Sequence, residues 1–115
     1  MIGFKVKRNL SVMPNREVVI FRLSGSFEIK DFTFEISDTD CKLVLTVDKD
    51  KLTIPLNFFY GLLSKYVASS YNASTGLYQF NFRDISVEDF FEAKIVNTGS
   101  DKITISRAMI YIESE

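Results

Sequence analysis

Apolar and polar side chains alternate along most of the chain, the pattern of strands that bury one face. In the first such segment Ile2, Phe4 and Val6 share one face, and Lys5 and Lys7 occupy the other, which we interpret as the solvent face. Similar segments recur at intervals of roughly 8–15 residues, a spacing typical of an antiparallel sandwich or barrel. They lie at 17–23, 27–36, 41–47, 52–54, 78–83, 91–96 and 102–112.

Two of these segments change the parity of their apolar positions partway along. Ile29 and Phe32 fall on opposite faces of an ideal strand, so we predict a β-bulge or bend near Lys30–Asp31. The last segment changes parity in the same way, which indicates either a bulge near Arg107 or coverage of both faces late in the strand. The run at 17–23 is almost wholly apolar, as expected for a strand covered on both faces.

One stretch has helical rather than strand spacing. Leu56, Phe59 and Leu63 recur at intervals of three and four, and Pro55 suits the boundary between a strand and a helix. We therefore predict one short helical segment near 55–66, followed by a loop from Ala68 to Gly76. About eight strands and this segment form an all-β, single antiparallel β-sandwich domain over residues 1–115.

Composition supports a sheet fold and narrows the chemistry. Val, Ile, Thr, Tyr and Phe supply 43 residues against 16 for Ala, Leu and Met, and branched and aromatic side chains favour sheets. The chain has no His, the commonest general base and metal ligand. Its single Cys41 can form neither an internal disulfide nor a thiolate cluster, and we expect it to be a small core residue. We expect no cofactor and no metal.

The charges are balanced, with 14 basic and 15 acidic side chains and a net charge of -1. Nucleic acid binding needs clustered Lys and Arg, so no nucleic-acid partner is expected. The run Lys5, Lys7 and Arg8 is read as a solvent face, with a nucleic-acid contact as the weaker alternative. The N-terminus lacks the roughly 7–15 apolar residues of a signal peptide, and no run approaches the ~20 residues of a membrane span.

Acidic residues gather at three places. Asp38-Thr39-Asp40 and Asp48-Lys49-Asp50 lack the Gly and Glu positions of a calcium-binding EF-hand loop, so these Asp side chains are expected to cap their own turns. The densest cluster consists of Asp84, Glu88, Asp89 and Glu92. Paired carboxylates can hydrolyse glycosides across a cleft, so a small hydrolase is one functional hypothesis, ranked after the two given below. A solvated connection between two apolar strands is the favoured interpretation, and we do not expect an enzyme.

Aromatic residues are abundant, with 11 Phe and 5 Tyr but no Trp. Most are expected to fill the interior. The residues predicted to be largely buried are Phe21, Phe34, Leu45, Phe80, Phe82, Ile95 and Ile105. Tyr66, Tyr71 and Tyr78, together with Asn72, surround the predicted loop and form a candidate interaction surface for another chain or for carbohydrate.

One short motif carries a family resemblance. Ile54-Pro55-Leu56-Asn57-Phe58-Phe59 resembles a strand end that leads into a helical segment in jelly-roll major capsid proteins of large double-stranded DNA viruses. The continuation at 60–63 departs from that family, and 115 residues are too few for two jelly rolls. The segment 90–112 is similar to the closing hairpin of viral and archaeal surface β-sandwiches. The resemblance implies a jelly-roll-like sandwich in a virion.

The leading hypothesis is a non-enzymatic structural subunit, a capsid or capsid-associated β-sandwich that assembles with itself or with a larger shell. Such a protein would be made in the host cytoplasm and located in the virion. The alternative is a β-sandwich module that binds carbohydrate or a receptor through the surface around Tyr66, Tyr71, Asn72 and Tyr78.

Overall fold

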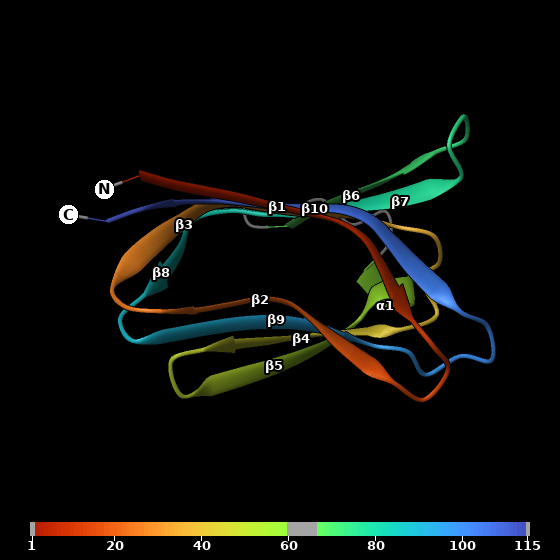
Figure 1. Cartoon of the computed structure of the whole chain (residues 1–115), viewed down its shortest axis with the longest axis horizontal. Coiled ribbons are helices and arrows are strands. Elements are labelled where there is room, and N and C mark those ends of the chain that lie inside the picture. Colours follow the sequence, from red (N-terminus) through yellow and green to blue (C-terminus); the bar gives the residue numbers. More distant parts are fainter. Residues whose placement is uncertain (1, 60–66, 115) are drawn as a thin grey trace.

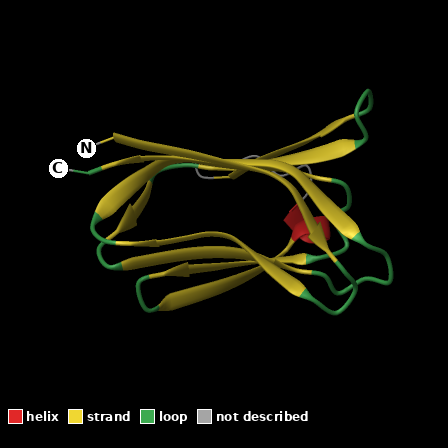
Figure 2. Ribbon diagram, viewed as in Figure 1, coloured by secondary structure: helices red, strands yellow, loops and turns green. Residues whose placement is uncertain are grey.

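The structure, a computed structural model, describes residues 2–59 and 67–114. Two antiparallel sheets pack face to face (Figure 1), with one short helix at one end between them (Figure 2). The predicted all-β antiparallel sandwich is therefore confirmed. The elements are β1 (Ile2–Val12), β2 (Glu17–Ser24), β3 (Phe27–Ile36), β4 (Lys42–Val47), β5 (Asp50–Pro55), α1 (Leu56–Phe59), β6 (Val67–Asn72), β7 (Leu77–Phe82), β8 (Ile85–Val87), β9 (Phe90–Val96) and β10 (Ile103–Glu113).

Strand pairing follows the wrapping of a jelly roll. Strands pair from the two ends of the chain inward: β1 with β10, β2 with β9, β3 with β7 and β8, and β4 with β5. Further pairing of β10 with β3 and of β9 with β4 joins these strand pairs into two sheets. The first sheet has the order β1-β10-β3-β7-β6 and the second β2-β9-β4-β5. This is the double-sheet jelly-roll arrangement, with β6 added at one edge.

The core lies between the sheets and is largely aromatic. Phe32 is at its centre, and its ring centroid lies 5.6–6.0 Å from those of Phe21, Phe34, Phe82 and Phe91. Edge-to-face and stacked pairs at this spacing add to the stabilisation from burial alone. The core prediction is confirmed for all seven residues, namely Phe21, Phe34, Leu45, Phe80, Phe82, Ile95 and Ile105.

Three β-bulges account for the changes in parity. Lys30 is the extra residue of β3 where that strand pairs with β10, and Ser106 is the extra residue of β10. Both bulges lie where the sequence predicted them. A third bulge lies at Ile20 in β2, so that Ile20 and its neighbour Phe21 are both buried. The apolar run at 17–23 therefore reflects a bulge, and the expectation of a strand covered on both faces is wrong, since Arg22 is exposed.

The helical prediction is confirmed where the structure describes it. Pro55 ends β5, and the first residue of α1, Leu56, is buried and donates its N–H to the Cys41 carbonyl at 3.1 Å. The remainder of the predicted segment, including Leu63, lies outside the described residues.

The described residues contain ten strands rather than about eight, because two predicted connections form strands. Residues 68–72 of the predicted loop belong to β6, and β8 lies within the connection predicted between β7 and β9. Most side chains of β6 are small or polar and have low intrinsic strand propensity. The backbone of β6 nevertheless pairs with the edge of β7, and this tertiary context outweighs the propensity. The three residues of β8 extend the line of β7 along β3.

Candidate functional site

The first half of β1 turns its apolar face to solvent. Lys5 is paired with Ile110 and Lys7 with Ala108 across the β1–β10 ladder, and both partners are buried in the core. Directly opposed residues share a face, so the two lysines lie on the inner side of the sheet at its edge. Both lysines are exposed, as the sequence predicted, but they reach solvent from the core-facing side of this edge strand and not from its outer face. The Lys7 ammonium lies 5.5 Å from the Phe21 ring centroid, a cation–π contact.

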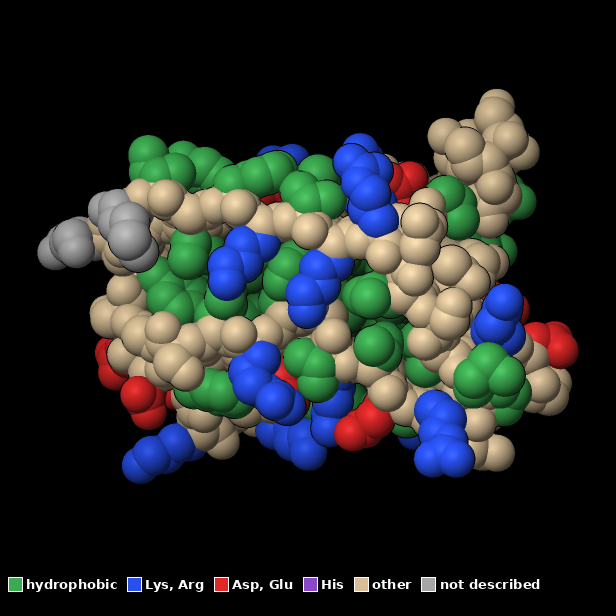
Figure 3. Space-filling model, viewed as in Figure 1, with side chains coloured by type: hydrophobic (Ala, Val, Ile, Leu, Met, Phe, Trp, Pro, Cys, Tyr) green, Lys and Arg blue, Asp and Glu red, His purple; other side chains and the backbone are tan. Residues whose placement is uncertain are grey.

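This arrangement is stable because a lysine has two chemically different parts. Its aliphatic stem can cover apolar surface while its ammonium group reaches water. In Figure 3, hydrophobic side chains are visible in the gap between the two sheets, and Lys and Arg side chains lie across them. Basic side chains therefore lie across the gap between the sheets, while the backbone edge of β1 pairs with β10 alone among the described residues.

The outer side of β1 carries an exposed row of apolar residues. Ile2 is 67% exposed, Phe4 60% and Val6 39%. Across the ladder, Tyr111 lies opposite Phe4, and Met109 opposite Val6, both half-buried on the same outer face. We call these five residues the apolar stripe. Contiguous exposed apolar surface is typical of interaction sites.

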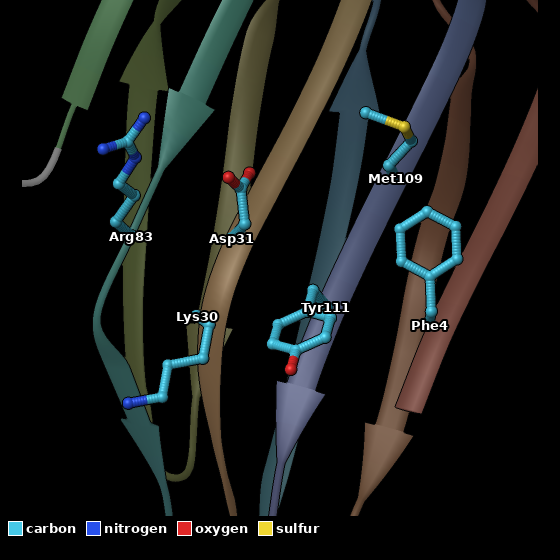
Figure 4. A pocket seen from close by; sticks show the side chains of 6 residues that line it. All are labelled: Phe4, Lys30, Asp31, Arg83, Met109 and Tyr111. Atoms are coloured by element: carbon cyan, nitrogen blue, oxygen red, sulfur yellow. The ribbon is translucent and has the colours of Figure 1, made fainter. Parts of the chain in front are cut away.

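A groove of about 440 Å³ lies beside this stripe on the outer face of the first sheet (Figure 4). One side of the groove is apolar and the other is charged. Its lining residues are Phe4, Met109 and Tyr111 on the apolar side, and Lys30, Asp31 and Arg83 on the charged side. This volume is within the range of small-molecule sites, ~300–1,000 Å³. We call it the mixed groove.

Two buried polar side chains beside the mixed groove hold its charged residues in place. Thr33 donates its hydroxyl hydrogen to Asp31 Oδ1 at 2.6 Å, and Asn81 Nδ2 donates to the same oxygen at 2.6 Å. Asn81 Nδ2 also donates to Thr33 Oγ1, and Arg83 Nε donates to Asn81 Oδ1 at 2.8 Å. This chain of hydrogen bonds orients the Asp31 carboxylate and the Arg83 guanidinium on the outer face.

Carboxylates balance the charge of Lys30 in the same groove. Its ammonium lies 3.1 Å from Glu28 and 3.9 Å from Glu113, and the hydrogen bond to Glu28 raises the pKa of Lys30. The Tyr111 hydroxyl donates to Glu113 at 3.0 Å, which raises the pKa of Tyr111. Of the three charged residues that line the groove, Lys30 therefore forms ion pairs. Asp31 and Arg83 form no ion pair with any of the described residues.

The predicted tyrosine surface lies elsewhere, on the β6–β7 hairpin. Tyr71 and Tyr78 are directly opposed, with ring centroids 4.6 Å apart; Tyr71 is exposed and Tyr78 half-buried. Asn72 Oδ1 accepts a hydrogen bond from the Ser74 N–H at 2.9 Å, which holds the turn. Tyr66 lies outside the described residues. The hairpin projects beyond the body of the sandwich (Figure 1), and none of its residues lines the mixed groove.

In the acidic cluster of the sequence, the Glu92 side chain forms an ion pair, and the backbone of Glu88 and Asp89 is capped by Asp48. Glu92 forms an ion pair with Arg22 at 2.7 Å. Asp48 accepts hydrogen bonds from the backbone N–H groups of 88–90, the closest at 2.7 Å. These bonds, chiefly from Phe90 and Asp89, lower the pKa of Asp48. Asp48 therefore caps a distant loop, and the expectation that it caps its own turn is wrong.

Two other sequence expectations are confirmed. Asp38 caps its own turn, where its Oδ1 accepts a hydrogen bond from the Asp40 N–H at 3.1 Å. Cys41 is buried in the core, and burial raises the pKa of its thiol to about 12. At neutral pH this cysteine is a protonated, weakly reactive core residue.

The fold defines a class, the jelly-roll β-sandwich, with an apolar stripe and a mixed groove on one outer face. No family model matches the chain, and no curated protein is detectably similar to it in sequence. Among residues 2–59 and 67–114, His, Cys, Asp and Glu side chains form no group of three that could hold a metal ion. Within the same residues, no helix has the length and apolarity needed to cross a membrane.

Reasoning from the sequence alone missed the mixed groove. A signal was present, because polar residues occupy every second position of both neighbouring strands, as at Asp31 and Thr33 in β3 and at Asn81 and Arg83 beside them. Only the pairing of β3 with β7 brings Thr33 opposite Asn81. Alternation within one strand does not indicate which distant strand pairs with it.

Proposed function

We propose that the chain is a non-enzymatic structural subunit that assembles with copies of itself or with a larger shell. In this proposal it is a capsid or capsid-associated jelly roll, made in the host cytoplasm and located in the virion. Jelly rolls occur in viral capsids, but also in lectins and enzymes, so the fold alone does not select this role. The observation that carries the proposal is the apolar stripe.

The stripe leaves three large apolar side chains of β1 exposed to solvent. Phe4 is 60% exposed at the centre of the row, with Ile2 and Val6 exposed on either side. Burying a large apolar side chain contributes roughly 1.5–3 kcal/mol relative to leaving it in water. Assembly would cover this row, and repetition of one such contact builds symmetric rings or shells.

Light scattering after size-exclusion chromatography tests the proposal over a range of concentrations. The wild-type chain is expected to self-associate, and Phe4→Glu should weaken association about tenfold or more, because it places a charge in the contact. Leu52→Glu is the matched control, since Leu52 is 58% exposed on β5, the edge strand of the other sheet. A strictly monomeric wild type, with no partner in the native particle, would overturn the proposal.

Carbohydrate or receptor binding is the second candidate function, and the mixed groove favours it. The oriented Asp31 carboxylate could accept hydrogen bonds from sugar hydroxyls, and the Arg83 guanidinium could donate to them. The Tyr111 ring offers an apolar surface on the opposite side. A glycan array tests this function, with Asp31→Asn as the groove variant and Asp50→Asn as the control. Absence of glycan binding, or equal binding by both variants, would reject it.

A further inference from the structure

We propose that the free edge of β1 accepts an extended segment of a partner protein whose side chains alternate between apolar and acidic. The inference rests on the proposed assembly function, since the segment would belong to a neighbouring protein of the assembly. It concerns the backbone edge of β1, whereas the apolar stripe concerns the outer face of the same sheet.

The edge is long and available. β1 spans 11 residues and lies at the end of the first sheet, and its ladder partner within the described residues is β10 alone. Alternate N–H and C=O groups of such a strand point away from the sheet, where an extended peptide can pair with them. Strand addition of this kind derives affinity from the backbone and specificity from alternate side chains.

Side chains on the two faces of β1 define the partner. An added strand would place one row of its side chains beside Ile2, Phe4 and Val6 on the outer face. Its other row would lie beside Lys5 and Lys7 on the inner side of the sheet. The first row therefore fits apolar side chains, and the second fits acidic ones.

The inner lysines Lys5 and Lys7 differ in their ion pairing from two lysines on other strands. Lys30 forms an ion pair with Glu28, and Lys94 with Glu17. Among residues 2–59 and 67–114, no carboxylate lies within 4.0 Å of Lys5 or Lys7. Acidic side chains from a partner would supply this missing complement.

The same lysines disfavour a second copy of β1 as the occupant. Pairing β1 with itself would bring the Lys5 and Lys7 side chains of both copies together on one face, and like charges across a ladder are destabilising. Inward-pointing charges are a known means of preventing uncontrolled edge pairing. Lys5 and Lys7 therefore disfavour pairing between two copies of β1 and favour pairing with an acidic strand.

Fluorescence anisotropy with two labelled peptides of roughly eight residues tests the inference, one alternating Val with Glu and the other alternating Val with Lys. The full chain is expected to bind the Glu peptide about tenfold or more tightly than the Lys peptide, and added salt should reduce the difference. Methylation of alternate backbone nitrogens in the Glu peptide should abolish binding, because strand addition needs those donors.

Charge reversal on β1 provides the decisive variant. The double change Lys5→Glu and Lys7→Glu should reverse the preference in favour of the Lys peptide. The matched control is Lys49→Glu with Lys51→Glu, at the β4–β5 hairpin of the other sheet, and should leave the preference unchanged. If charge reversal unfolds the chain, Lys5→Gln with Lys7→Gln keeps most of each stem and should remove the preference.

Three results would overturn the inference: equal binding of both peptides, undiminished binding of the methylated peptide, or an unchanged preference in the β1 variants. These outcomes are separate from the test of the proposed function. A chain that self-associates through the apolar stripe but does not select the Glu peptide refutes the edge inference alone. A chain that selects the Glu peptide but never assembles refutes the assembly function alone.

Discussion

The side-chain amide of Asn97 donates a hydrogen bond at 2.9 Å to the carbonyl of Val12, the last residue of β1. Asn97 directly follows β9, so this bond joins the ends of strands from the two different sheets. The same amide donates to the Asp101 carbonyl at 2.8 Å, and its oxygen accepts from the Gly99 N–H at 2.9 Å. Asn97 is fully buried, and its side chain fixes the closing loop of the sandwich.

Asn97→Ala is therefore expected to lower the free energy of unfolding by about 1–3 kcal/mol, the cost of leaving a buried polar group without its hydrogen bond. Urea denaturation measures the change. Asn57→Ala serves as the control, since Asn57 is exposed on α1 and should have little effect. A loss no greater than the control's would show that the three hydrogen bonds of Asn97 contribute little.

Phe80→Ala is expected to destabilise the domain by about 3–5 kcal/mol, because it removes a fully buried ring and leaves a cavity. The Phe80 ring stacks on Phe34 with centroids 5.5 Å apart. A melting temperature close to that of wild type would contradict this packing. Phe58→Ala is the matched control, because Phe58 is 73% exposed and its truncation should change the melting temperature far less.

The strand pattern predicted the fold well because a buried face repeats with period two. A change of parity also predicted the bulges at Lys30 and Ser106, since polar residues on the other face made the change visible. The bulge at Ile20 was hidden for the opposite reason. Val18, Val19, Ile20 and Phe21 are all apolar, so the sequence contains no polar row against which a shift can be detected.

The same pattern does not indicate which face of an edge strand points inward. Alternation correctly separated Phe4 from Lys5 and Lys7, but the lysines lie on the inner side. A core position at the rim of a sandwich can hold a lysine, because its ammonium group reaches water past the edge. The mixed groove was missed for a related reason, since Thr33 and Asn81 meet only through pairing of strands 48 positions apart in the sequence.

Asp48 makes the stability of the domain depend on pH. Its backbone hydrogen bonds hold the pKa of Asp48 below its unfolded value of about 3.9, so they stabilise the fold above that pH. This contribution is lost as the pH falls through the lower, folded pKa. Asp48→Asn should reduce stability at neutral pH and flatten the decline below about pH 4, as measured by denaturation across a pH series.

Asp50→Asn is the control for this pH dependence, because Asp50 lies exposed in the same hairpin. It should leave the acid-dependent decline of stability close to that of wild type. An equal slope in Asp48→Asn and wild type would show that the bonds to residues 88–90 do not depend on the ionised carboxylate.

Tyr71→Ser separates folding from assembly at the β6–β7 hairpin. Tyr71 is 46% exposed and contacts Tyr78, so its removal is expected to cost at most the ~0.5–1.5 kcal/mol of an aromatic pair and to change the melting temperature little. If the ring is an anchor between subunits, the same change should weaken assembly by about 1–2 kcal/mol, measured by light scattering. Gln79→Ser, an exposed change on the same hairpin, should affect neither property. Unimpaired assembly of Tyr71→Ser would reject the hairpin as a contact and place that contact on the apolar stripe of β1 and β10, where Phe4→Glu already tests it.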